Sequence, residues 1–536
     1  MGIIYNPVEL KPGQTQYGTK TFDSNTIYPA KYRKSIFYPD NPVLGAIPPR
    51  PSEKELYDEI TNSIPFDFKR LVAENQNDKP LILDAIHYVK NSVRLYLPNM
   101  FRVSNEIHNS LMSSYSRRKI NYAYDFSIGQ DSLVPRFIPI DRGDAACGSY
   151  VLGESGTGKS TAVELGLRFI PQVLEHPLDG DGELKQIVYI KVDCKKDGFK
   201  QIIQSIGAEI DTALHNPFQT HQKMLAANAR RSQADQELVL AQLINAFGIG
   251  LLIFDESQEL RYDSAYNRSI TNLLNLSNTT KCAIMFVGTH YFNGYENAVE
   301  DTTKGVRRVG GDVKFDDYCH DDFTFDSILH TITQYSVFPP DVDFRNDPVL
   351  KAAFETYSDG NIDAITTIWE DISAAYVEMD NKPIVDKSFI EWVIQNRCFH
   401  RNDLVAKKIA KRWYAFEDRV NNIFAKNQST EEDAVLIPNQ RQMLEALKTV
   451  CQKVKQNFEM MENVSYEEDV LEKAIQEACL QQLRKEKPDI QEKSIQSATQ
   501  KLLDKKYKPK TKKRPTAVSL PSAIPGIPSS TTPEIL

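Results

Sequence analysis

The chain has 536 residues, enough for roughly two to four domains of about 150 residues each. Its 64 lysines and arginines against 72 aspartates and glutamates give a net charge of −8, which excludes a uniformly basic nucleic-acid binder but not a local basic patch. Seven scattered cysteines without Cys-x-x-Cys spacing argue against a disulfide framework and a zinc ribbon. Since no stretch resembles a signal peptide or a membrane span, we expect a cytoplasmic protein without a membrane partner.

Residues 1–135 are predicted to form an N-terminal arm and a small helical accessory domain. The first 50 residues are rich in Tyr, Pro, Asn and Thr and hold two proline-led turns, at 38–42 and 47–51. Such a segment is typical of an extended arm that lies on another part of the protein. Apolar residues then recur at helical spacing between Leu81 and Val89.

Residues 136–345 alternate between strand-like and helix-like segments and predict a nucleotide-binding core. Helices are expected at 159–170, 202–214 and 236–247, and strands are expected at 149–152, 186–192, 251–254 and 282–287. The strands are apolar on both faces and helices separate them. This pattern indicates a buried parallel sheet between helices.

The remaining residues predict helices and a flexible end. Residues 346–425 have helical periodicity and are assigned to a helical lid domain, and residues 426–536 to a C-terminal helical segment and tail. Lys501–Arg514 contain eight basic residues and one acid, followed by a Pro/Ser/Thr-rich end that is expected to be disordered. The predicted fold class is α/β, with a parallel-sheet core, a helical lid, an N-terminal helical and extended accessory region, and a flexible basic C-terminal tail.

The clearest chemical signal is a Gly-x-x-x-x-Gly-Lys-Ser motif between the first core strand and the next helix. Its glycines let backbone N–H groups point at phosphate, and the helix that follows adds its positive N-terminal dipole. Lys159 is expected to reach the β- and γ-phosphates of ATP, and Ser160 to coordinate Mg²⁺. The predicted nucleotide-binding set is Gly153, Glu154, Ser155, Gly156, Thr157, Gly158, Lys159, Ser160 and Thr161.

Two further core strands end in polar residues. Asp255 and Glu256 follow the apolar run 251–254, where open parallel sheets place ligands. Asp255 is predicted to hold Mg²⁺ and Glu256 to position and polarise the attacking water. Thr289, after the next strand, is a candidate sensor of the γ-phosphate or the water. The alternatives are a strand that ends in solvated acids and an ordinary Gly-Thr turn.

Basic residues give weaker signals. Arg307 and Arg308 complete the candidate catalytic set if one of them reaches the ATP of a neighbouring subunit, and otherwise they belong to a solvated loop. The lid sequence around Gly360 lacks the arginine often found at a second sensor, which leaves nucleotide sensing by the lid open. Candidate DNA-phosphate contacts, with a solvated helix face as the alternative, are Lys195, Lys196, Lys200, Lys223, Arg230 and Arg231.

Taken in order, these motifs resemble the TnsC family of AAA+ ATPases, which regulate certain cut-and-paste transposons and are related to TniB and MuB. The resemblance covers about residues 36–425. It rests on the arm 38–49, the segment 189–194, the Gly250–Leu260 stretch, Val287–Thr289 with the two arginines downstream, and 358–360 at the start of a lid helix.

The resemblance implies an ATPase that assembles as a ring or helical filament on double-stranded DNA in its ATP state. A TnsD/TniQ-like or RNA-guided target selector would direct that assembly, and TnsA/TnsB-like transposase subunits would be recruited to it. Hydrolysis would then release the protein from DNA. The competing interpretations are an AAA+ DNA motor or helicase loader and a signalling ATPase. A small-molecule kinase is disfavoured, because Glu256 beside Asp255 suits the activation of water.

Overall fold

The structure is a computed structural model in which two compact units are distinguished, Met1–Ala415 and Phe416–Leu536. It describes residues 3–61, 64–124, 133–140, 148–179, 183–194, 199–228, 233–258, 266–289, 309–315, 322–358, 360–397, 447, 449–458, 464–465, 468–483, 491–506 and 510–511. Among these residues, no helix is long and apolar enough to cross a membrane.

A parallel sheet forms the centre of the first unit, as the sequence predicts, and it has five strands, of which the one at Val309–Phe315 was not among those expected. Its order is β10-β4-β9-β8-β7, so the strand that leads into the glycine loop lies between two strands that come much later in the chain. The strands are β4 (Gly148–Gly153), β7 (Tyr189–Asp193), β8 (Leu251–Asp255), β9 (Ala283–Gly288) and β10 (Val309–Phe315).

The single strand expected at 186–192 is two strands in two different sheets. β6 (Glu183–Ile187) pairs antiparallel with β5 (Val173–Pro177), which the sequence analysis did not predict. β7 begins after Val188 and pairs parallel with β8. A continuous run of strand-forming residues does not show where one strand ends and the next begins, and this explains the difference.

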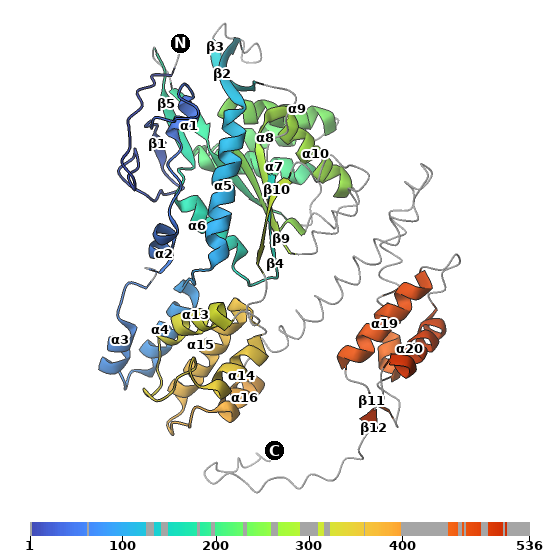
Figure 1. The fold of residues 1–536 in the computed structure, drawn as a ribbon. Coiled ribbons are helices and arrows are strands. Elements are labelled where there is room, and N and C mark those ends of the chain that lie inside the picture. Colours follow the sequence, from blue (N-terminus) through green and yellow to red (C-terminus); the bar gives the residue numbers. More distant parts are fainter. Residues whose placement is uncertain are drawn as a thin grey trace, which may run out of the picture. The chain divides into compact units, whose positions relative to one another are not determined.

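The central sheet buries both faces, and alternate residues of each strand serve different hydrophobic clusters. In β8, Leu251 and Ile253 belong to the cluster that contains α5 and α6, whereas Leu252 and Phe254 belong to the cluster that contains α7 and α9. Helices therefore cover both sides of the sheet (Figure 1). They are α5 (Pro98–Ser116), α6 (Lys159–Arg168), α7 (Phe199–Ala213), α8 (Thr220–Asn228), α9 (Gln233–Phe247) and α10 (Tyr266–Thr280).

The N-terminal arm adds a strand to the small side sheet. β1 (Ile27–Pro29) pairs parallel with β5, so the small sheet has the order β1-β5-β6. The helices that follow share the hydrophobic cluster of α5 and α6 and do not form a separate core. The other elements of this region are α1 (Pro42–Ala46), α2 (Glu53–Thr61), α3 (Phe68–Glu74), α4 (Lys79–Ser92) and an antiparallel hairpin of β2 (Arg118–Tyr124) and β3 (Leu133–Pro139).

A buried histidine joins the arm to the small sheet. The Nε2 of His176 on β5 lies 2.7 Å from Gln186 Oε1, and its Nδ1 lies 3.0 Å from the hydroxyl of Tyr32 in the arm. With the amide oxygen as acceptor, Nε2 carries the proton and Nδ1 accepts from the tyrosine. Burial lowers the pKa of His176 to about 4, so the ring is neutral in the folded protein at neutral pH.

We expect this histidine to make the first unit sensitive to mild acid. As the pH falls below 6.5, the unfolded chain takes up a proton that folded His176 does not bind. Its contribution to the free energy of unfolding therefore decreases by about 2 kcal/mol between pH 7 and pH 5. Urea unfolding at the two pH values checks this. The variant His176→Gln should lose that part of the pH dependence, and an unchanged slope in the variant would contradict the assignment.

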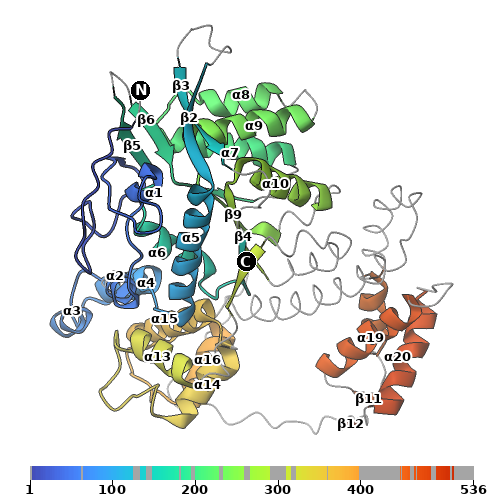
Figure 2. The same ribbon diagram turned by 45° about the horizontal axis from the view of Figure 1, so that its top comes forward.

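Four helices form a group below the sheet in Figure 1, in which the other three pack against α15, with α4 alongside. They are α13 (Asp322–Thr333), α14 (Pro348–Ser358), α15 (Ile362–Glu378) and α16 (Lys387–Asn396), and Figure 2 shows the same group from a second direction. Trp369 of α15 is buried at the centre of this group. Glu370 faces α4, where its carboxylate lies 2.8 Å from His87 Nδ1 and 3.7 Å from Lys90 Nζ. These contacts link α15 to α4.

The second unit is a small helical structure with its own buried residues. α19 (Glu468–Leu483) packs against α20 (Glu492–Lys506), and residues 449–458 are also helical. The sequence analysis predicts this helical character. Two short antiparallel strands, β11 (Val464–Ser465) and β12 (Lys510–Thr511), pair part of the basic tail with the segment that precedes α19.

Candidate functional site

The glycine-rich loop between β4 and α6 is held in its conformation by hydrogen bonds from its own side chains to its backbone. Gly156 and Gly158 have φ of +83° and +92°, a left-handed backbone that other residues adopt at a cost. Glu154 O accepts hydrogen bonds from Thr157 Oγ1 at 2.8 Å and from Lys159 Nζ at 2.6 Å. Burial lowers the pKa of Lys159, although nearby carboxylates oppose the shift. The ammonium group thus lies over the loop.

The loop and strand β8 meet at the carboxyl edge of the sheet. Ser160 Oγ, in the first turn of α6, lies 3.3 Å from Asp255 Oδ1 at the end of β8. The Asp255 side chain is almost completely buried, at 6% exposed. A hydroxyl and a carboxylate oxygen at this spacing are suitable ligands for Mg²⁺, which proteins usually bind through one or two carboxylates together with substrate phosphates. The residues present therefore fit the predicted metal.

Lys191 of β7 is the cation that faces Asp255. Its Nζ lies 3.1 Å from Asp255 Oδ2, with Glu164 and Asp193 at 3.5 and 3.8 Å. Burial lowers the pKa of Lys191, but the carboxylates of Asp255, Glu164 and Asp193 together outweigh burial and raise it. The ion pair neutralises a carboxylate that would otherwise be buried unpaired. Lys191 lies within the TnsC-like segment 189–194, where the sequence pattern alone gives it no role.

We expect Lys191→Met to destabilise the nucleotide-free protein more than the loaded protein. Without the lysine, Asp255 loses its ion pair, which costs about 3 kcal/mol because the pair is largely buried. Bound Mg²⁺ with ADP would supply positive charge to the same carboxylate. Thermal melting with and without Mg²⁺ and ADP measures the difference. Lys185→Met, which breaks an exposed pair with Glu175, is the control and should respond equally in both conditions. Equal destabilisation of Lys191→Met in both conditions would refute the idea.

Glu256, Gln258 and Thr289 form a chain of hydrogen bonds along the same edge. Glu256 has φ of +52°, uncommon for a residue with a side chain, and its side chain is exposed. Gln258 Nε2 donates to the Glu256 carboxylate, and Gln258 Oε1 accepts from the backbone N–H of Thr289 at 3.2 Å. The Thr289 hydroxyl is buried and has no hydrogen-bond partner among the described residues. A free buried hydroxyl at this position is consistent with the predicted sensor.

The start of α15, a helix of the predicted lid, contacts the glycine loop. Asn361 Nδ2 donates to Ser155 O at 2.7 Å, and the backbone N–H of Asp363 donates to Gly156 O at 3.2 Å. A β-carbon on Gly156 would lie 2.7 Å from Asn361 Oδ1 and 2.9 Å from Asp363 Cβ. The lid therefore reaches the loop through an amide side chain and a backbone N–H, at the place where the sequence lacks an arginine.

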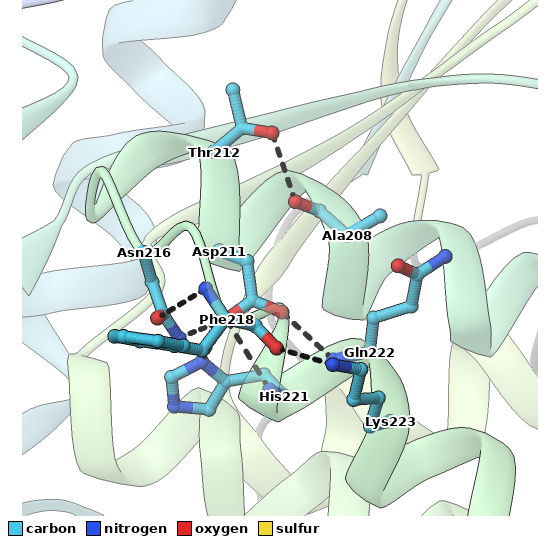
Figure 3. A network of polar contacts seen from close by, with 8 residues as sticks. All are labelled: Ala208, Asp211, Thr212, Asn216, Phe218, His221, Gln222 and Lys223. Carbon is cyan, nitrogen blue, oxygen red and sulfur yellow. Dashed lines mark hydrogen bonds and ion pairs between the residues drawn. The ribbon is translucent and has the colours of Figure 1, made fainter.

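Among the predicted DNA contacts, Lys223 is the one whose side chain the structure describes. It lies on α8, and its Nζ donates to Phe218 O at 2.9 Å (Figure 3). The buried carboxylate of Asp211 fixes the same turn by accepting from Asn216 Nδ2 and His221 Nδ1 at 2.6 and 2.7 Å. Lys200 lies in the first turn of α7. The following predicted residues fall outside the described residues: Lys195, Lys196, Arg230, Arg231, Arg307 and Arg308.

A parallel sheet with a glycine-rich phosphate loop, a buried Asp255 and an adjacent Glu256 at its carboxyl edge defines a P-loop nucleotide-binding core of the AAA+ class. In agreement, the family described as AAA domain matches residues 145–295. A search of curated proteins finds no match.

Several solved structures are similar at low identity. The Aeropyrum pernix ORC2 protein in its ADPNP-ADP complexes has 11% identity and a TM-score of 0.30, covering 47% of this chain and 62% of that chain, less than two thirds of its length. The ADP form of the same protein has 10% identity and a TM-score of 0.33, covering 67% and 79%. The Aeropyrum pernix ORC1 protein in complex with DNA has 12% identity and a TM-score of 0.34, covering 76% and 84%.

Proposed function

We propose that this chain is an ATP-dependent regulator of DNA transposition. In its ATP state it oligomerises as a ring or filament on double-stranded target DNA and links a TnsD/TniQ-like or RNA-guided target selector to TnsA/TnsB-like transposase subunits. Hydrolysis disassembles the complex. The approach of Ser160 and Asp255, with Glu256 next in the chain, is the observation that carries the ATPase assignment. The ordered TnsC-like motifs support the link to transposition.

The proposed chemistry uses residues that already meet at the carboxyl edge. Ser160 and Asp255 would hold Mg²⁺, which neutralises phosphate charge when bound. Lys159 exchanges its hydrogen bond with Glu154 O for contacts with the β- and γ-phosphates. The carboxylate of Glu256 accepts a hydrogen bond from the attacking water while Gln258 limits its movement.

Two more groups complete the proposed reaction. The free hydroxyl of Thr289 is available to the γ-phosphate or to the water. Arg307 or Arg308 of a neighbouring subunit would stabilise charge in the transition state, which ties hydrolysis to assembly. An active site that needs an arginine from the neighbouring subunit hydrolyses ATP only within the assembly. This suits a switch in which hydrolysis sets the lifetime of the assembly.

Helices α7 and α8 support the proposed DNA contact. Lys200 lies in the first turn of α7 and Lys223 lies on α8, and these two consecutive helices pack against each other. Lys195, Lys196, Arg230 and Arg231 are proposed to extend this set. Repeated around a ring or filament, such groups would contact DNA phosphates without regard to sequence, and binding would weaken steeply with salt.

Electron microscopy of the full chain on linear duplex DNA tests the proposal. A slowly hydrolysed ATP analogue should give rings or filaments on DNA, whereas ADP should not. Lys159→Ala should abolish the assemblies, because nucleotide binding is lost. Particles that stay monomeric on DNA in every condition would overturn the assembly model. A strand-separation assay on the same samples distinguishes the competing motor, which predicts unwinding and fast DNA-stimulated turnover.

A further inference from the structure

The contact between the lid and the phosphate loop has a specific geometry. Asn361 makes two hydrogen bonds at once: its Oδ1 accepts from Ala364 N at 3.2 Å, which caps α15, and its Nδ2 donates to Ser155 O at 2.7 Å. Asp363 N then donates to Gly156 O, the next carbonyl along the loop. Two successive carbonyls of the loop are thus bound by the first turn of one helix.

This arrangement determines where the loop N–H groups point. In a planar trans peptide the carbonyl and the N–H of the same unit point in opposite directions. Ser155 O shares its unit with the N–H of Gly156, and Gly156 O shares its unit with the N–H of Thr157. Because both carbonyls face α15, both N–H groups point away from it. Successive N–H groups directed to one side of a loop form the concave site that binds phosphate.

The helix that makes these bonds is itself held in place. Asn361 is buried, and Ile365 and Ile368 on the following turns belong to the hydrophobic cluster of the first unit. Farther along, Glu370 pairs with two side chains of α4. A side chain on so rigid a support can impose its geometry on a loop that contains left-handed glycines.

We propose that Asn361 is a positioning residue for nucleotide binding, which keeps the phosphate loop in its phosphate-binding conformation. This inference rests on the proposed ATPase function and adds a way in which the nucleotide affinity of the site is regulated. The lid controls affinity by orienting loop N–H groups, without a cation that touches the γ-phosphate. Any event that moves the lid, such as assembly with a neighbouring subunit, therefore changes the affinity of the loop for ATP and ADP alike.

Two variants of the full chain test the proposal. Asn361→Asp keeps an oxygen to cap α15 but loses the donor to Ser155 O, and Asn361→Ala loses both. Each should weaken the binding of fluorescent ADP and of a fluorescent, slowly hydrolysed ATP analogue by about tenfold, the effect of one lost hydrogen bond. Hydrogen exchange of the peptide that covers residues 154–158 should also accelerate.

The matched control is Asn41→Asp. Asn41 is another helix-capping asparagine, whose Oδ1 accepts from Leu44 N and whose Nδ2 donates to Tyr115 O, remote from the loop. Its substitution should lower the melting temperature and leave nucleotide affinity unchanged. Normal affinity in both Asn361 variants, or a loss confined to the ATP analogue, would overturn the inference while the ATPase proposal stands. Wild-type protein that binds neither nucleotide would overturn both.

Discussion

Replacing Glu256 by Gln is expected to stop ATP turnover while nucleotide binding remains close to that of the wild type. The amide preserves the size of the side chain and retains an oxygen for the hydrogen bond from Gln258, so the local geometry should survive. It removes the negative charge that polarises the attacking water. Loss of such a group lowers kcat by about 10²- to 10⁴-fold. Because Ser160 and Asp255 are unchanged, the binding of ATP should not suffer.

Steady-state phosphate release and the affinity for a fluorescent ADP separate these effects. Glu183→Gln on β6, a strand of the small side sheet, makes the same chemical change away from the site and should have wild-type kinetics. If the ATP state holds the protein on DNA, Glu256→Gln should also form long-lived assemblies with ordinary ATP. Turnover within tenfold of the wild type would show that another group activates the water.

The sequence predicted those parts of the site that lie within single short segments. The glycine loop carries its own spacing, and β8 and β9 are apolar runs that end at Asp255 and before Thr289. The parallel pairing of the strands also follows from the alternation of strands and helices, because parallel neighbours need a connection that crosses the sheet. For these features, the structure expected from the local sequence is the one found in the fold.

Contacts between segments that are distant in the sequence could not be predicted from local sequence patterns. Lys191 looks like an ordinary polar residue in a buried strand until β7 and β8 are paired in register. The register places Lys191 opposite Ile253, from where it reaches Asp255 on the same strand. Gln258 follows the acid pair without any motif of its own. Asn361 is a standard helix cap in sequence, and its second hydrogen bond exists because the lid folds back on the loop. In each case the partner is supplied by tertiary structure.

Gly156→Ala should impair nucleotide binding more strongly than loss of any single lid hydrogen bond. The new β-carbon would lie 2.7 Å from Asn361 Oδ1 and 2.9 Å from Asp363 Cβ, so the loop and α15 must separate. The left-handed backbone at φ +83° adds strain for alanine. Together, crowding and strain cost about 2–4 kcal/mol, part of which appears as lower stability and part as weaker binding. We expect a loss of affinity for ADP of about 30-fold or more, measured by fluorescence titration.

Gly13→Ala separates the strain from the crowding. Gly13 has a similar φ of +77°, but a β-carbon there would have no atom within 4 Å. This control should lower the melting temperature slightly, through strain alone, and leave the affinity for ADP unchanged. The comparison tests whether contact with the lid, and not the flexibility of the glycine itself, sets the affinity of the loop. If the two variants lose stability equally and both bind ADP normally, the loop keeps its shape without α15, and the lid has no part in nucleotide binding.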